Sequence, residues 1–469
     1  MLEKIKNFFF IVTLPITNIV RKRKQPWLYI NENNKSAESM SDLLNDEIIK
    51  MIESRFIGTW INDMIVVDLL GRGTFSYCFL CFEPRTNTFK ACKIILPCYY
   101  KQACEERDNI KKINLDHKIK CIKLPGHPRA LCFVNTLFGE SIGVLLDKNN
   151  FIKTNKDNLF YAIKQLCTQI VHIHNHNYVH CDIKLDNIMS NVYNNYILEL
   201  KNYILSLNIQ SQLEIENDIG IKSNKNVKKE INKKRNLIKN RIKDEMFKFK
   251  KIMKHQNNVN KQQFIEVEDF DNLLIDDLED NLWTKTVNLA SFYKLHLIDY
   301  GSLEKPQHDA YDITYYSYRA PENILNLDIQ PSCDIWSLGC IIFEILTGEL
   351  LFHERYYDNV INSEQDLLHQ IFSKLGQNIE DKEYIKNSKY GKQYINSVHS
   401  LDNYETQSKI IYYLRQNNRF QLSFEEILLW SNLLQSMLEF IPSNRIRSNT
   451  LLKHPVFACI DNDFEDVFI

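Results

Sequence analysis

The sequence predicts an α+β protein with two lobes, a small β-rich lobe followed by a larger helical lobe that a long insert interrupts. Residues 64–80 and 88–96 are β-rich runs around two glycines, which favours a small sheet. Residues 159–175 and 335–346 carry apolar side chains at helical spacing or on nearly every side, which favours buried helices. More than a hundred residues, many of them charged, separate Asn187 from Asp299.

The composition indicates a globular chain with a sizeable core. It has 469 residues, of which 44% are hydrophobic and 12% aromatic, enough for two to three domains. The net charge of −1 gives no general attraction to nucleic acid or anionic lipid. We therefore expect no direct nucleic-acid partner and no membrane association.

The twelve cysteines are scattered, which favours reduced thiols and a cytoplasmic and/or nuclear location. One close pair, Cys78 and Cys81, lies in a strand-like run with no second pair to complete a zinc site. Residues three apart on a strand point to opposite faces, so a structural role is favoured over metal binding.

The N-terminus admits three interpretations. Residues 8–20 are apolar but too short to span a bilayer, which takes about 20 apolar residues. They lead into the basic run Arg21–Lys24. A signal or anchor and a nuclear-import signal stay open beside a poorly ordered or packed extension, which is favoured.

Changes in composition predict the domain boundaries. Residues 31–45 are polar and turn-rich, as in a linker. Helices are expected at 101–112, 425–440 and 451–457. The predicted division is an extension at 1–55, a first lobe at 56–146, a second lobe at 147–190 and 292–460, an insert at 191–291 and a tail at 461–469.

The insert is predicted to be largely disordered. It opens with an apolar, helix-like run at 193–207. Residues 222–254 then contain fourteen basic and three acidic residues, and residues 264–283 are acidic and apolar. Such charged, low-complexity runs bury too little apolar surface to offset chain entropy. A docking or localisation arm and a solvated expansion loop stay open.

The predicted small sheet carries a candidate phosphate-binding loop. Glycines between two strands let backbone N–H groups approach phosphate closely. Lys93 follows on a later strand, where its ammonium would hold the α- and β-phosphates of ATP if Glu106 fixed it; Glu105 and Asp108 are alternative partners. The full set of candidate nucleotide-binding residues is Leu70, Gly71, Arg72, Gly73, Thr74, Phe75, Ser76, Cys78, Lys93 and Glu106.

Two motifs in the second lobe supply the charges that phosphoryl transfer requires. In His180–Asn187, Asp182 would take the proton of a substrate hydroxyl, and Lys184 would neutralise the transferring group. Asn187 and Asp299 offer the hard oxygen ligands that Mg²⁺ prefers. The predicted cofactors are therefore ATP and Mg²⁺, in a cleft that brings Lys93 and Asp299 together.

Residues 71–457 resemble the eukaryotic protein kinases, and the chain is similar to the group that contains cyclin-dependent, mitogen-activated, LAMMER and SR-protein kinases. Tyr318–Glu322 and Asp334–Gly339 are similar to landmarks of the larger lobe in that family. The resemblance implies a bilobal kinase fold in which Glu322 pairs with Arg445 and Asp334 braces the catalytic loop.

Within that group the chain most resembles the SR-protein kinases. Ser76 stands at the third glycine position, Cys181 replaces the arginine before the catalytic aspartate, the insert is Lys-rich, and residues 434–455 follow the family's closing segment. The resemblance implies a monomeric serine/threonine kinase for Arg/Ser-rich splicing factors. Cys181 cannot pair with a phosphorylated loop, so we expect constitutive activity.

The chain also departs from the family. Asp299 is followed by Tyr-Gly, which keeps a ring in place of the usual apolar residue. Tyr315 stands where the family has a threonine that bonds the catalytic residues, with Thr314 one residue away, and Tyr316 replaces a substrate-contacting arginine. Two acidic residues match positions that guide Arg-rich substrates in the SR-protein kinases, namely Glu364 and Asp366; a solvated helix N-terminus is the alternative interpretation. A LAMMER or dual-specificity relative and a pseudokinase scaffold acting through the insert stay as alternatives.

Overall fold

The computed structural model describes residues 56–73, 76–123, 130–147, 156–210, 225–266, 294–307, 314–325, 327, 329–354, 363–376, 379–388 and 407–458. These residues fall into two compact units. The first draws on Met1–Asp108, Asn114–Leu137 and Asn194–Lys285, and the second on Asn109–Ile113, Phe138–Tyr193 and Thr286–Ile469. The predicted extension at 1–55 and tail at 461–469 lie outside the described residues.

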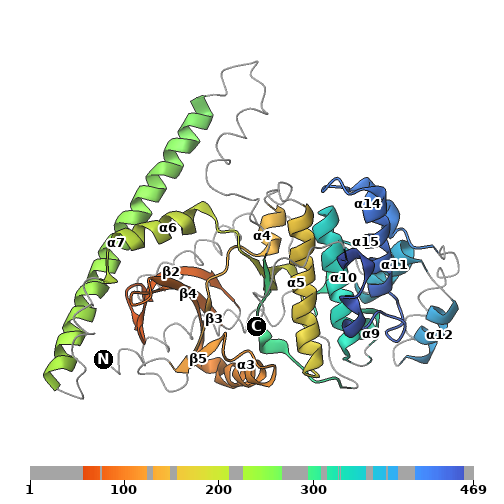
Figure 1. Ribbon diagram of the computed structural model, residues 1–469, viewed down its shortest axis with the longest axis horizontal. Coiled ribbons are helices and arrows are strands. Elements are labelled where there is room, and N and C mark those ends of the chain that lie inside the picture. Colours follow the sequence, from red (N-terminus) through yellow and green to blue (C-terminus); the bar gives the residue numbers. More distant parts are fainter. Residues whose placement is uncertain are drawn as a thin grey trace, which may run out of the picture. The chain divides into compact units, whose positions relative to one another are not determined.

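A six-stranded antiparallel sheet forms the centre of the first unit, with strand order β1-β2-β3-β4-β6-β5 (Figure 1). Its strands are β1 (Trp60–Ile61), β2 (Met64–Arg72), β3 (Ser76–Glu83), β4 (Thr88–Ile95), β5 (Lys120–Lys123) and β6 (Leu131–Thr136). The unit also holds the start of α3 (Tyr100–Lys112). The predicted small sheet and the predicted helix at 101–112 are confirmed.

The inner face of this sheet carries the hydrophobic core of the first unit. Alternate residues of β2, β3 and β4, among them Val66, Phe79 and Cys92, join one buried cluster. Cys81 belongs to this cluster and is wholly buried, whereas Cys78 is only half-buried. The two cysteines therefore lie in different environments, as the alternation of a strand requires.

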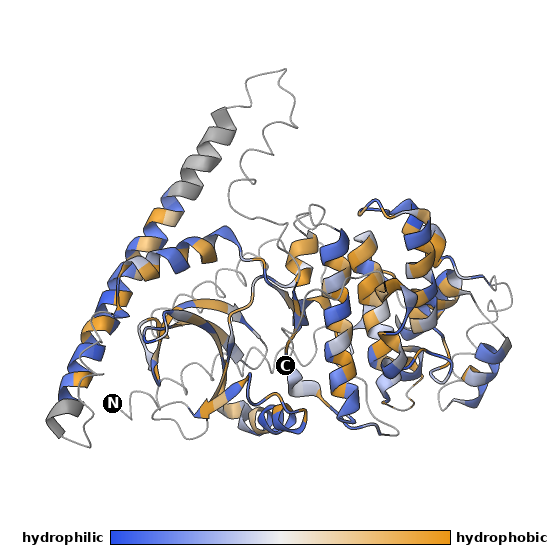
Figure 2. Cartoon of the chain, in the orientation of Figure 1, coloured by the Kyte–Doolittle hydropathy of each residue, from blue (hydrophilic) through white to orange (hydrophobic). Residues whose placement is uncertain are grey.

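Two helices of the insert, α6 (Asn195–Ser206) and α7 (Lys225–Glu266), belong to the first unit, and α7 packs against β2 (Figure 1). The basic stretch for which the composition predicted disorder thus forms most of α7. Between its ends, the helix carries both hydrophilic and hydrophobic residues (Figure 2). Four apolar residues recur at helical spacing and are buried: Ile238, Ile242, Met246 and Phe249. Their packing stabilises the helix, although the charge of the whole stretch indicated disorder. The acidic stretch beyond Glu266 lies outside the described residues.

The second unit is mainly helical (Figure 1). Its helices are α4 (Ile142–Asp147), α5 (Lys156–Asn175), α9 (Pro321–Ile324), α10 (Pro331–Thr347), α11 (Ser363–Leu375), α12 (Ile379–Asn387), α14 (Ile410–Gln416), α15 (Phe424–Met437) and α16 (Ser448–Leu451). At the centre, α10 is buried on nearly every side, as predicted. It begins at Pro331 and ends at Thr347, and it is capped by Gly348, whose φ of 76° lies in the left-handed region.

Local sequence signals set the last elements of the second unit. Ser423 and Glu426 form a reciprocal capping box that starts α15. The helix predicted at 451–457 is instead the end of α16 and a single 3-10 turn, Pro455–Phe457. Pro455 explains the difference, because it lacks the N–H that a continuing helix would need.

No helix in the described part of the chain combines the length and hydrophobicity needed to cross a bilayer.

Candidate active site

The glycine-rich segment lies at the turn between β2 and β3. β2 ends at Arg72 and β3 begins at Ser76, and the Gly73 amide donates to the Ser76 carbonyl oxygen at 2.9 Å. Gly71 and Arg72 are exposed, whereas Leu70 is half-buried. Thr74 and Phe75 lie outside the described residues. The turn thus exposes backbone at the point where the sequence predicted phosphate binding.

Lys93 and Glu106 form the ion pair expected in the first unit. The Lys93 ammonium nitrogen lies 2.9 and 3.1 Å from the two carboxylate oxygens of Glu106, on α3. Glu106 is 6% exposed, whereas Glu105 pairs with Lys101 at the surface. Because Glu106 is buried and bidentate, it can hold Lys93 in one orientation.

The catalytic loop gathers Asp182, Lys184 and Asn187 in the second unit. The Lys184 ammonium donates to both Asp182 carboxylate oxygens, at 3.0 and 2.8 Å. The Asn187 side-chain nitrogen donates to the Asp182 backbone oxygen at 2.9 Å and to its Oδ2 at 3.0 Å. These hydrogen bonds fix the Asp182 carboxylate. Because the amide nitrogen of Asn187 faces Asp182, its amide oxygen faces away from Asp182.

Asp334, in the first turn of α10, binds the backbone of the catalytic loop. Its carboxylate accepts from the backbone amides of His180 and Cys181 at 2.7 and 3.0 Å, and it contacts His174 Nε2 at 2.9 Å. The predicted brace is therefore confirmed. Sequence reasoning missed His174, because its spacing marks it only as part of the end of α5.

Asp299 follows β8 (Leu295–Leu297), which pairs with β7 (Ile188–Ser190). Its φ of 67° places it in the left-handed region, a strained conformation that is common at functional sites. The next residue, Tyr300, is buried, and its hydroxyl donates to the Leu297 carbonyl oxygen at 2.8 Å. Burial raises the pKa of Tyr300, so the ring stays neutral.

The donor set of the second unit fits Mg²⁺. Asp299 offers a half-buried carboxylate and Asn187 an amide oxygen, and hard oxygen atoms are the ligands that Mg²⁺ prefers. These two residues would hold the ion, which would neutralise phosphate charge when bound.

The departure at Tyr315 is compensated by its neighbour. Tyr315 is 51% exposed, whereas Thr314 is 4% exposed and its hydroxyl donates to the Cys181 carbonyl oxygen at 3.4 Å. Thr314 thus contacts the backbone next to Asp182 in place of the side-chain contact that the family pattern implies.

The carboxylates proposed to guide basic substrates are differently placed. Asp366 is 5% exposed and accepts from Gln370 at 2.6 Å and from the Tyr316 hydroxyl at 3.4 Å. The expectation that it faces a substrate is therefore wrong, since its carboxylate is buried against Gln370 of α11 and Tyr316. Glu364 is more open and lies 3.9 Å from Arg319.

The candidate residues thus form two sets with complementary chemistry. The first unit holds the exposed glycine turn and the Lys93–Glu106 pair, and the second holds a fixed carboxylate, a lysine and two oxygen ligands. A curled antiparallel sheet with these groups, joined to a helical unit built on α10, defines the bilobal protein kinase fold.

The chain belongs to the protein kinase domain family, whose model matches residues 64–222 and 270–457. The break between the two matched segments falls in the insert. A search of solved structures found the crystal structure of the PF14_0431 kinase domain, with a TM-score of 0.50 and 18% identity over 85% of this chain and 97% of that one. This likeness supports the fold.

Relatives of the chain are named as dual-specificity or serine/threonine kinases. It is 25% identical over 416 residues to dual specificity protein kinase lkh1 of Schizosaccharomyces pombe, covering 85% of this chain and 47% of lkh1. It is 23% identical over 423 residues to dual specificity protein kinase CLK2 of Mus musculus, covering 86% and 66%. Serine/threonine-protein kinase spk-1 of Caenorhabditis briggsae is 31% identical over 144 residues, 31% of this chain and 12% of spk-1. The chain spans about half to two thirds of the length of the first two relatives.

Proposed function

We propose that the protein is a Mg·ATP-dependent serine/threonine protein kinase. The observation that carries this proposal is the Asp182 carboxylate, held by Lys184 and Asn187 in a loop that α10 braces. A scaffold without catalysis has no need of this arrangement, and membership of the protein kinase family supports the same reaction.

Each site residue then has a chemical task. Lys93, fixed by Glu106, would hold the α- and β-phosphates of ATP. Asp182 would orient the substrate hydroxyl and accept its proton as the oxygen attacks the γ-phosphorus and the bond to the bridging oxygen breaks. Lys184 would neutralise charge on the transferring group, and ADP would leave.

The proposed substrates are proteins with Arg/Ser-rich segments. Support comes from the SR-protein kinase resemblance of the sequence, and the similarity to spk-1, which is named a serine/threonine-protein kinase, supports the type of residue phosphorylated. Glu364, near the start of α11, is 37% exposed at its side chain and lies 3.9 Å from Arg319, so of the two carboxylates it is the one that a substrate guanidinium could reach. A dual-specificity enzyme is the second candidate, because lkh1 and CLK2 carry that description.

Turnover of ATP in the presence of peptides tests both levels of the proposal. We expect phosphate incorporation into an Arg-Ser repeat peptide, with less into a Pro-directed peptide, and a loss of about 10²-fold or more in Asp182→Ala. Phosphotyrosine in products from a peptide array would favour the dual-specificity candidate. Equal and negligible rates in the wild type and in Asp182→Ala would favour a pseudokinase scaffold.

A further inference from the structure

Asp68, at the middle of β2, is a buried carboxylate that two residues of the insert hold. It is 3% exposed. The Lys250 ammonium of α7 lies 2.8 Å from its Oδ1, and the Tyr196 hydroxyl of α6 donates to its Oδ2. A charge taken out of water needs such partners, because desolvation otherwise makes it costly. We call Asp68, Tyr196 and Lys250 the insert clamp.

The clamp acts on an irregular part of β2. The pairing of β2 with β3 shifts its register between Val66 and Asp68 and again between Leu69 and Gly71. A bulge interrupts the hydrogen-bond ladder and bends the strand, and bulges recur next to active sites. Asp68 lies between the two shifts, three residues before Gly71. The clamp therefore holds β2 in place where its hydrogen bonds to β3 are interrupted.

The insert also covers the outer face of the sheet. The register pairs Asp68 with Leu80 and Ile65 with Phe82. The three apolar residues among these, Ile65, Leu80 and Phe82, alternate along their strands with the residues of the inner core. Ile65 and Leu80 are wholly buried and Phe82 is 1% exposed, although they lie outside the inner core. α7 packs on β2, and the apolar residues of α7 named above are themselves buried.

A second attachment lies near the start of β2. Arg235 of α7 donates to Asp63 at 2.8 Å, and its guanidinium carbon lies 4.9 Å from the centre of the Trp60 ring. Gly58, with φ of 76°, permits the close approach of α7, because a Cβ there would lie 2.7 Å from the Lys239 carbonyl oxygen. The helix is therefore anchored at the middle of β2 and at the residues just before the strand begins.

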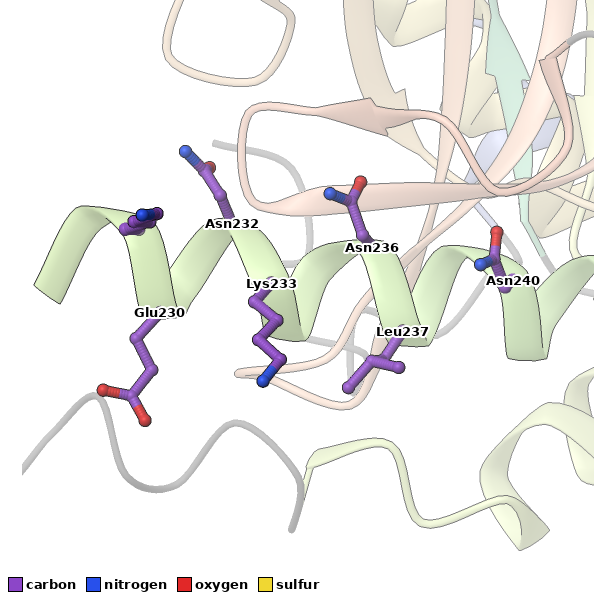
Figure 3. Close-up of a pocket in the computed structure, with 7 residues that line it drawn as sticks. Glu230, Asn232, Lys233, Asn236, Leu237 and Asn240 are labelled. Atoms are coloured by element: carbon purple, nitrogen blue, oxygen red, sulfur yellow. The ribbon is translucent and has the colours of Figure 1, made fainter. Parts of the chain in front are cut away.

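The opposite side of α7 offers no comparable site among the described residues. A hollow there is lined by one helix, with Asn232, Asn236 and Asn240 pointing to one side and Glu230, Lys233 and Leu237 to the other (Figure 3). These side chains diverge and do not converge on a ligand. Lys251, next to Lys250, is exposed and provides a control.

We propose that Asp68 is a positioning residue for nucleotide binding, through which α6 and α7 hold the glycine turn in its binding conformation. The proposal rests on the proposed ATP-dependent function. If the turn samples other conformations when the clamp is broken, the apparent dissociation constant rises as the inverse of the competent fraction. Saturating nucleotide restores the competent form, so the maximal rate changes little.

Single substitutions in the clamp test this idea. We expect Lys250→Gln and Tyr196→Phe to raise the KM for ATP and the Kd of a non-hydrolysable ATP analogue about tenfold, for a competent fraction of about one tenth. We expect kcat per folded molecule to stay within about twofold and Lys251→Gln to match the wild type. Tyr196→Phe loses only a hydroxyl, so it serves if Lys250→Gln does not fold.

Three outcomes separate the explanations. A lower melting temperature with an unchanged Kd and KM would mean that the clamp only stabilises the fold, which overturns the proposal. Additive effects of Asp68→Asn and Lys250→Gln on Kd would also overturn it, since residues that act as a pair are not additive. A wild type that binds the analogue but turns over no ATP would contradict the proposed function and leave the Kd comparison decisive for the clamp.

Discussion

Glu322 and Arg445 form a two-pronged ion pair in the interior of the second unit, as the family resemblance predicted. Arg445 Nη1 lies 2.7 Å from Glu322 Oε1, and Nη2 lies 3.0 Å from Oε2. The side chain of Arg445 is 0% exposed and that of Glu322 is 2% exposed. The Arg445 guanidinium carbon lies 5.1 Å from the centre of the Trp336 ring. Each charge depends on the other, because water does not reach either.

Breaking this pair should be far more costly than breaking a surface pair. We expect Glu322→Gln to lower the free energy of unfolding by about 3–5 kcal/mol, because it leaves the buried Arg445 guanidinium without its counter-charge. Lys156 and Glu426 also lie 2.7 Å apart, but 39% and 24% of their side chains are exposed. Lys156→Gln should therefore cost about 1 kcal/mol or less. Chemical denaturation measures both, and equal losses would contradict the prediction.

Short motifs predicted most of the candidate site. The carboxylate, lysine and amide of 182–187 fall within six residues, so their grouping depends on little beyond the local loop. Asp366 was placed wrongly, because its burial depends on contacts with Tyr316 and Gln370 that no local pattern announces. The contact of Thr314, and not of Tyr315, with the catalytic loop was also not predictable, because it depends on the hydrogen bond between Thr314 and the Cys181 carbonyl oxygen.

The order of strands and helices was also predictable, and the helix-like run at 193–207 is confirmed as α6, but α7 was not predicted. Alternation of apolar residues marks β2 to β4, and the apolar run of α10 marks a buried helix. The high charge of the stretch that forms α7 predicted disorder, whereas a helix packs if one of its faces is apolar. The positions of Ile242 and Phe249 on that face carried the missing signal.

Two phenylalanines of α7 test whether the insert is part of the fold. Phe249 is 4% exposed, with its ring centre 5.6 and 5.1 Å from those of Tyr196 and Tyr203, whereas Phe247 is 75% exposed. We expect Phe249→Ala to cost about 3–5 kcal/mol of unfolding free energy. Phe247→Ala should stay within about 0.5 kcal/mol. Thermal and chemical denaturation measure the difference, and matching values would mean that α7 adds nothing to stability.

His180 should make stability depend on pH. Burial lowers its pKa below the ordinary 6.5, although Asp334, Asp182 and Asp299 act in the opposite direction. Between 6.5 and the lowered folded value, the unfolded chain binds a proton that the folded chain does not, so acidification favours unfolding. The wild type should lose up to about 1.4 kcal/mol per pH unit in that window relative to His180→Phe, which cannot titrate.

The comparison needs the difference between the two proteins at each pH. His369 and His454 also have pKa values lowered by burial, and their effects cancel because both proteins keep them. Denaturation curves from pH 7.5 to pH 5 supply the data. Parallel pH profiles would show that protonation of His180 is not linked to folding.

Cys181 leads to the last prediction, that catalysis does not depend on phosphorylation of the protein itself. The residue is 4% exposed, its amide donates to Asp334, and its thiol contacts the Val179 carbonyl oxygen at 3.7 Å. A buried thiol offers no positive charge to a phosphate, whereas an arginine at this position would. Protein treated with phosphatase and shown by mass spectrometry to carry no phosphate should keep kcat within about twofold of untreated protein. A catalytically dead Asp182→Asn variant, which cannot modify itself, controls for phosphate added during expression. A tenfold or greater fall after treatment would show that another basic group reads a phosphorylated loop in place of residue 181.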